Sequence, residues 1–132
     1  QPVMMRLQSD LPELCLSAIE QTLDTQTTQW DSRCAVGVVL AAGGYPGSYA
    51  KGTIISGLDK PCGEHQKVFH AGTALKDGEV VTSGGRVLCA TALGLSVGEA
   101  QAAAYELVDN IQWDKVYFRT DIAYRAIARE NT

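Results

Sequence analysis

The stretch CAVGVVLAAGGYPG, residues 34–47, decides the fold of this chain. Its first part, residues 34–42, is an almost continuous apolar run of valine, leucine and alanine. Such a run is typical of a strand that is buried on both faces. The Gly-Gly-Tyr-Pro-Gly that follows has the composition of a turn. The sequence therefore predicts a central buried strand that ends in a glycine-rich bend.

Further strands follow a long loop that is rich in glycine and holds a short extended piece at residues 53–55. Apolar and β-branched runs predict strands at residues 67–71, 79–82 and 86–92. The connections between them are short. Lys76-Asp77-Gly78 is predicted to close a hairpin, and Ser83-Gly84-Gly85 to form a second turn.

Helices are predicted on both sides of these strands. Asp10 and Glu13 form a pair that resembles a capping box and opens a helix over residues 11–23, and the capping box Ser96-Val97-Gly98-Glu99 opens a second one to about residue 111. A short strand over residues 116–118 and a last helix from Asp121 end the chain. Helices thus bracket consecutive strands instead of alternating with them. The predicted fold class is therefore α+β, with a mainly antiparallel sheet and flanking helices.

The first 32 residues differ from the rest. The chain enters an apolar stretch at Val3 at once, as a strand or loop cut from a longer protein would, so the sequence is interpreted as a fragment. An apolar stripe is predicted along the helix over residues 11–23. Residues 24–32 are polar and are expected to form a linker, from which Trp30 docks back on the body.

Composition narrows the classes of function. The chain has 132 residues, which is close to one domain, and 15 acidic against 11 basic residues give a net charge of −4. That balance disfavours binding to nucleic acids or anionic membranes.

The four cysteines form no C-x-x-C pair, so neither a metal site nor a disulfide framework is expected. The expected location is therefore a reducing cytoplasm. Cys15 and Cys89 are expected to be small buried hydrophobes.

Two doubled-glycine turns are the candidate functional features. The candidate substrate-binding residues are Gly43, Gly44, Tyr45, Gly84, Gly85 and Arg86. Glycine pairs allow close backbone approach to a ligand, and Arg86 offers charge-assisted hydrogen bonds to a phosphate or carboxylate. In the alternative interpretation both turns only change the direction of the chain. No phosphate-loop, dinucleotide or nucleophile-elbow motif is present, and no catalytic residue is assigned.

Five segments in this order resemble a known family. They are Ala41-Ala42-Gly43-Gly44-Tyr45-Pro46-Gly47, the spacing from Lys51-Gly52 to Gly57-Leu58, Val68-Phe69-His70-Ala71-Gly72-Thr73, Gly84-Gly85-Arg86-Val87-Leu88 and Tyr117-Phe118-Arg119-Thr120-Asp121-Ile122. Together they resemble the C-terminal part of the phosphoribosylamine–glycine ligases, also called glycinamide ribonucleotide synthetases. The resemblance implies that residues 1–32 are the tail of an ATP-grasp domain. Residues 33–132 would be the small C-terminal domain, which is barrel-sandwich-hybrid-like.

The family's activity is what this resemblance implies for the parent protein. In de novo purine biosynthesis, glycine is joined to 5-phosphoribosylamine through glycyl phosphate, and ATP becomes ADP and phosphate. ATP and Mg²⁺ (or Mn²⁺) are the implied cofactors of the full-length enzyme, and none is expected in this fragment. The family's metal ligands and nucleotide lysines correspond to sequence before Gln1, so the isolated chain is expected to be inactive. Its implied partners are the missing portions of the same protein, phosphoribosylamine and glycine.

The two glycine bends are expected to form one wall of a pocket that absent polypeptide completes. A stand-alone, non-catalytic α+β module that binds a small anion or a protein partner remains the alternative. One departure from the family is local: Ala123 and Tyr124 stand where a glycine is frequent, so the start of the last helix is expected to differ slightly.

Overall fold

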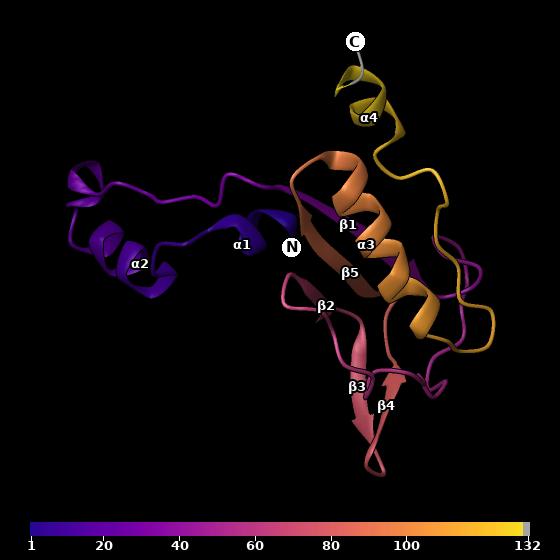
Figure 1. The fold of residues 1–132 in the computed structure, drawn as a ribbon. Coiled ribbons are helices and arrows are strands. Elements are labelled where there is room, and N and C mark those ends of the chain that lie inside the picture. The colour runs from indigo at the N-terminus through magenta and orange to yellow at the C-terminus, as the bar shows by residue number, and fades with distance from the viewer. Residues whose placement is uncertain (131–132) are drawn as a thin grey trace.

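A computed structural model describes residues 1–130 as a helix-covered antiparallel sheet, the body, with an extended N-terminal arm formed by residues 1–32 (Figure 1). The elements are, in chain order, α1 (Pro2–Arg6), α2 (Leu11–Ile19), the 3-10 turn η1 (Leu23–Thr25), β1 (Cys34–Ala41), β2 (Gln66–His70), β3 (Thr73–Lys76), β4 (Glu79–Thr82), β5 (Arg86–Gly94), α3 (Val97–Asn110) and α4 (Tyr124–Glu130). The larger sheet has the strand order β1-β5-β2 and is antiparallel throughout. The predicted α+β class with an antiparallel sheet is confirmed.

The core lies between this sheet and α3. Alternate residues of β1, including Val38 and Leu40, are fully buried together with Ala104 and Val108 of α3. The central strand β5 is buried along almost its whole length, as its apolar composition requires. The capping box at the start of α3 is present, because the Ser96 side chain accepts a hydrogen bond from the Glu99 backbone N–H at 3.1 Å.

A separate two-stranded sheet, β3-β4, projects from the body. Its turn residues Asp77 and Gly78 have φ values of 52° and 86°, which is typical of the predicted hairpin turn. The sequence prediction placed the turn and β4 correctly but omitted β3. The extended piece at residues 53–55 is also confirmed, because Ile54 forms a bridge with Val81 of β4.

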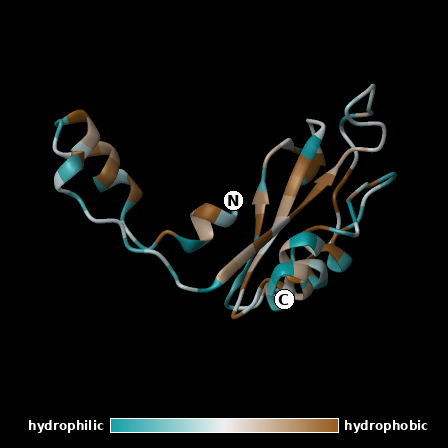
Figure 2. Ribbon diagram, turned by 90° about the horizontal axis from the view of Figure 1, so that it is seen from above, coloured by the Kyte–Doolittle hydropathy of each residue, from teal (hydrophilic) through white to brown (hydrophobic). Residues whose placement is uncertain are grey.

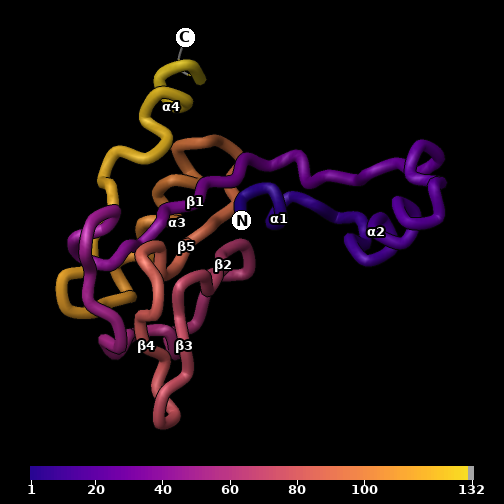
Figure 3. The backbone as a smooth tube through the Cα atoms, turned by 180° about the vertical axis from the view of Figure 1, so that it is seen from behind, coloured from indigo at the N-terminus to yellow at the C-terminus, as the bar shows by residue number. Residues whose placement is uncertain are grey.

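The N-terminal arm differs from the prediction in several ways. Residues 2–6 form a short helix, α1, and not a strand or loop, and α2 ends at Ile19 instead of continuing to residue 23. The apolar stripe of α2 faces solvent, with Ile19 78% exposed, and Cys15 is exposed as well. Both are exposed because α2 stands away from the body, as Figures 2 and 3 show from two further directions.

The two halves of the arm pair with each other. Trp30 is 44% exposed and lines a pocket together with Pro2 of α1 and Ala35 of β1. It forms a backbone bridge with Leu7 of the same arm, and its indole N–H donates to the Thr28 hydroxyl at 2.9 Å. By contrast, α1 packs on the sheet face opposite α3, where a Cβ added to Gly37 would lie 3.0 Å from Pro2 Cγ.

The C-terminal segment also differs from its prediction. Residues 116–118 form no strand. Tyr117 makes a single backbone bridge with Ala41 at the end of β1. The last helix begins at Tyr124 and not at Asp121, because Ala123 adopts a left-handed conformation with φ of 68°. Within residues 1–130, no helix is both long and apolar enough to cross a membrane.

Candidate functional site

The structure brings the two doubled-glycine turns together at one end of the larger sheet. We call residues 42–47, after β1, the first bend, and residues 83–86, before and at the start of β5, the second bend. The backbone N–H of Ala42, at the end of β1, donates to the carbonyl of Gly85 at 2.8 Å. The ring of Tyr45 packs directly against Gly85, so closely that a Cβ at position 85 would overlap it. The first bend therefore rests on the second, and a side chain at position 85 would separate them.

Gly72 holds the second bend from the other side. Its carbonyl accepts hydrogen bonds from the N–H groups of Ser83 at 2.7 Å and Gly84 at 3.0 Å, and its own N–H donates to the Arg86 carbonyl at 2.9 Å. A Cβ on Gly72 would lie 2.6 Å from Gly84 Cα. Since the neighbours are backbone atoms, only glycine permits this approach.

Gly43 and Gly44 shape the first bend. A Cβ on Gly43 would lie 2.5 Å from the carbonyl oxygen of Lys115, so this residue is packed against the loop before Tyr117. Gly44 has a φ of 97°, a conformation that side chains disfavour. These two glycines therefore set the direction in which Tyr45 projects.

A cavity of about 500 Å³ opens beside the bends. Its lining residues are Gln1, Val39, Tyr45, Ala71, Gly72, Gly85, Arg86, Leu88 and Cys89. Of the six candidate residues, Tyr45, Gly85 and Arg86 thus line the cavity. Gly43, Gly44 and Gly84 do not, and they act on its shape through the backbone.

Arg86 gives this cavity its charge. It is exposed, and within residues 1–130 its guanidinium makes no ion pair or hydrogen bond. Among the described residues 1–130, no aspartate or glutamate lines the cavity, although the chain has a net charge of −4. An unpaired guanidinium beside backbone that lacks side chains can bind a phosphate or carboxylate, at about 1.5–3 kcal/mol per charged hydrogen bond.

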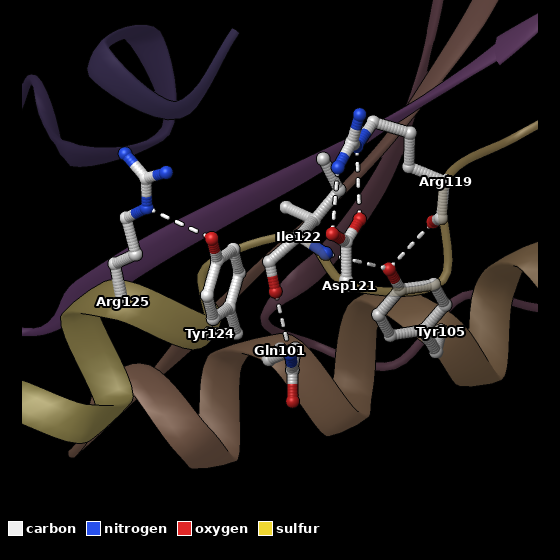
Figure 4. A network of polar contacts seen from close by, with 7 residues as sticks. All are labelled: Gln101, Tyr105, Arg119, Asp121, Ile122, Tyr124 and Arg125. Atoms are coloured by element: carbon white, nitrogen blue, oxygen red, sulfur yellow. Dashed lines mark hydrogen bonds and ion pairs between the residues drawn. The ribbon is translucent and has the colours of Figure 1, made fainter.

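A second polar cluster lies between α3 and α4 (Figure 4). Arg119 and Asp121 form an ion pair, with Nη2 and Oδ2 2.6 Å apart, and hydrogen bonding to Arg119 lowers the pKa of Asp121. The Tyr105 hydroxyl donates to the Arg119 carbonyl at 2.7 Å and accepts from the Ile122 N–H at 3.2 Å. This cluster anchors the C-terminal segment to α3. None of its residues is among those that line the cavity beside the bends.

Sequence reasoning did not select Gly72, Val39 or Cys89 as cavity residues. Gly72 carried a readable signal, because a glycine directly after a strand indicates close backbone approach. Val39 and Cys89 carried none, because facing neighbours on β1 and β5 are known only once the register is known. His70, at the end of β2, is exposed, and its Nδ1 lies 3.0 Å from the Thr73 hydroxyl.

The part of the chain that the structure describes does not form a metal centre. Among residues 1–130, no group of three or more His, Cys, Asp or Glu side chains is arranged to hold an ion. The arginine in the cavity repels cations. The site is therefore suited to the anionic part of a ligand.

Comparison with known proteins matches residues 35–125 to the family described as "Phosphoribosylglycinamide synthetase, C domain". The chain belongs to this family. The matched range contains both bends, Gly72 and every lining residue of the cavity except Gln1.

Two similar curated proteins have the same printed name, phosphoribosylamine--glycine ligase. The chain is 62% identical over 130 residues to "Phosphoribosylamine--glycine ligase" of Vibrio vulnificus (strain YJ016) and 62% identical over 130 residues to that of Pseudomonas syringae pv. tomato. A crystal structure of phosphoribosylamine--glycine ligase from Thermotoga maritima matches with a TM-score of 0.65 and 35% identity, over 84% of this chain and 28% of that one. The alignments cover 98% of this chain but 30% of each of the two curated relatives.

Proposed function

We propose that this chain is the C-terminal part of a phosphoribosylamine–glycine ligase, and that its cavity forms one wall of the site for phosphoribosylamine and glycine. The observation that carries the proposal is the unpaired Arg86 guanidinium beside two interlocked glycine bends, within a matched family domain. Phosphoribosylamine carries a phosphate and glycine a carboxylate, so both are anions of the class that this site suits.

The proposed role of the chain's residues is binding and orientation. Arg86 would hold the phosphate of phosphoribosylamine, and the backbone at Gly85 would allow its close approach. Tyr45 would cover one side of the bound ligand, since its ring lines the cavity and is 41% exposed. ATP would phosphorylate the glycine carboxylate, and the amine of phosphoribosylamine would then displace the phosphate. Mg²⁺ or Mn²⁺ would be held by the missing portions of the full-length ligase.

The sharpest test replaces Arg86 by alanine in the full-length ligase. Loss of one or two charged hydrogen bonds is expected to raise the KM for phosphoribosylamine about tenfold to a hundredfold. The KM for ATP should stay unchanged. Arg125→Ala is the matched control, because Arg125 lies on α4 over the Tyr124 ring and outside the cavity. Equal kinetics for Arg86→Ala and the unmutated enzyme would assign Arg86 to structure.

We further propose that the 132-residue chain alone binds no ATP and catalyses no ligation. Its family match is to the C domain, and its cavity has room and charge for an anion but no residue set for a metal–nucleotide complex. Calorimetric titration of the isolated chain with Mg·ATP should give no heat of binding. Micromolar affinity would contradict this, and would favour a binding module with its own ligand.

The remaining portion of the ligase is the proposed partner of this chain. The curated relatives are more than three times as long as the matched region, which leaves ample polypeptide to cover the arm. Exposed apolar side chains on that arm, such as Leu16 at 58% and Ile19 at 78%, supply the contact surface. The exposed thiols of Cys15 and Cys62 fit a cytoplasmic location, where thiols stay reduced.

A further inference from the structure

The ring of Tyr45 requires a second restraint if it is to form a fixed wall of the cavity beside Arg86. Tyr45 lines this cavity and is 41% exposed, and its ring rests against Gly85, which lines the cavity too. Gly85 offers only backbone atoms to the ring. This contact therefore sets how near the ring can come, but not how the ring is turned.

The side chain of Tyr49 supplies such a restraint. The ring centroids of Tyr45 and Tyr49 are 6.1 Å apart, and the two ring planes meet at 60° in an edge-to-face arrangement. The spacing lies in the range that favours aromatic pairs, about 4.5–7 Å. Because the attraction depends on the angle between the rings, the contact restrains the rotation of the Tyr45 side chain.

Tyr49 is itself anchored in the body. It is half-buried and packs against the core between the larger sheet and α3. The chain folds back after the first bend, so that Gly44 lies against the Ser48 carbonyl and the Tyr49 backbone, and a Cβ at position 44 would collide with that carbonyl. Tyr49 thus connects the exposed ring of Tyr45 to the core.

The contact between the two tyrosines works through their rings and not through their hydroxyl groups. Within residues 1–130, neither hydroxyl forms a hydrogen bond. The ring of Tyr49 is therefore the part that matters, and a phenylalanine at this position would preserve the contact.

We propose that Tyr49 is a positioning residue for the cavity, and that it holds the Tyr45 ring against Gly85 before a ligand binds. A wall that is already ordered lowers the entropy that binding would otherwise cost. Tyr49 does not line the cavity, so it acts on the ligand only through Tyr45. This inference rests on the proposed function, because it takes the ligand to be phosphoribosylamine.

Kinetics of the full-length ligase test the effect on binding. Tyr49→Leu keeps an apolar side chain for the core but removes the ring, and it should raise the KM for phosphoribosylamine about twofold to tenfold. The kcat and the KM for ATP should stay unchanged. Tyr49→Phe should restore the KM of the unmutated enzyme. Tyr124→Leu is the matched control, because Tyr124 lies on α4 and outside the cavity.

Crystal structures of the full-length ligase test the positioning directly. In the unmutated enzyme the Tyr45 ring should lie against Gly85 with the Tyr49 ring edge-to-face beside it. In Tyr49→Leu the Tyr45 ring should turn away from Gly85 or spread over several conformers. Should Tyr49→Leu fail to fold, Tyr49→Met replaces it in both measurements, since a flexible methionine adapts to an irregular core position.

Two outcomes would overturn the proposal. One is a Tyr45 ring that keeps its place in the variant, and the other is a displaced ring with an unchanged KM for phosphoribosylamine. The test also separates this proposal from the one on which it rests. A raised KM in Arg86→Ala together with an unmoved Tyr45 ring in Tyr49→Leu would overturn the role of Tyr49 alone, whereas unchanged kinetics in Arg86→Ala would overturn the anion site itself.

Discussion

At the scale of single residues, positions without a side chain decide the geometry of the candidate site. Gly72 and Gly85 each have neighbours so close that a methyl group would collide, one with backbone and the other with the Tyr45 ring. The two cases differ in how the collision could be relieved. A ring can rotate away from position 85, but the backbone around Gly72 has to move as a unit.

Gly72→Ala is therefore expected to destabilise the fold and to displace Arg86. Overpacking against backbone costs about 1–3 kcal/mol, which urea denaturation would measure as a lower free energy of unfolding. Gly98→Ala is the matched control, because its added Cβ meets nothing closer than the Ser96 hydroxyl at 3.7 Å. It should be neutral or stabilising, since alanine is favoured over glycine in a helix. Equal unfolding curves for the two variants would contradict the assigned role of Gly72.

Ala123 is the opposite case, a side chain where glycine would fit better. Its φ of 68° costs about 1–2 kcal/mol for a residue with a Cβ. Ala123→Gly should therefore raise the free energy of unfolding by up to about 1 kcal/mol, since glycine's extra freedom in the unfolded chain offsets part of the gain. Ala102→Gly, at an exposed position inside α3, should lower it by about 1 kcal/mol. A loss of stability in both variants would argue against the left-handed conformation at position 123.

At the scale of elements, a charged pair marks where the arm enters the sheet. Arg33, directly before β1, donates to the Asp31 carboxylate from its side chain and from its backbone N–H, the latter at 2.9 Å. The Arg33 side-chain hydrogen bonds hold the pKa of Asp31 well below its usual range. The pair thus fixes the direction in which the chain leaves the arm.

The lowered pKa of Asp31 predicts a pH dependence. Because the folded state favours the charged carboxylate, the stabilisation is complete above the ordinary aspartate pKa of about 3.9 and is lost as the pH falls below it. Arg33→Gln should return the pKa of Asp31 toward that ordinary value, as NMR titration of the carboxyl carbon would show. Arg129→Gln, on α4, should leave it unchanged. An unaltered Asp31 titration in Arg33→Gln would refute the pairing.

At the scale of the whole molecule, the body and the arm bury their apolar residues very differently. The sheet and α3 enclose a continuous core, whereas no apolar residue of α2 is buried. Figure 2 shows hydrophobic segments on the arm at a distance from the rest of the chain. An apolar surface of this kind requires a covering partner.

The isolated chain is accordingly expected to self-associate through its arm. Sedimentation velocity should show a species larger than a monomer that grows with concentration. Ile19→Glu places a charge on the exposed stripe, at the C-terminal end of α2, and should shift the distribution to monomer. Gln21→Glu adds the same charge at an exposed polar position and should not. Purely monomeric behaviour of the unmutated chain at high concentration would contradict this expectation.

The parts of the fold that were predictable from sequence are those with local causes. The buried run of β1, the Asp77-Gly78 turn and the Ser96 cap each act through near neighbours, and all are confirmed. The exposure of Ile19 was not predictable, because a helical stripe does not state what will cover it. For the site, glycine pairs located both bends, but only the register of β1 on β5 places them in contact.

The packing of α1 on the sheet has a practical consequence for anyone who shortens this protein. Removing residues 1–32 as a dispensable extension would also remove Pro2 from its place beside Gly37, next to the Cys89 sulfur. Cys89 is 3% exposed in the intact chain and is shielded from reagents. A truncated version would expose this thiol in the wall of the cavity beside Arg86, where alkylation or oxidation could block the cavity and mimic a loss of the proposed ligand binding.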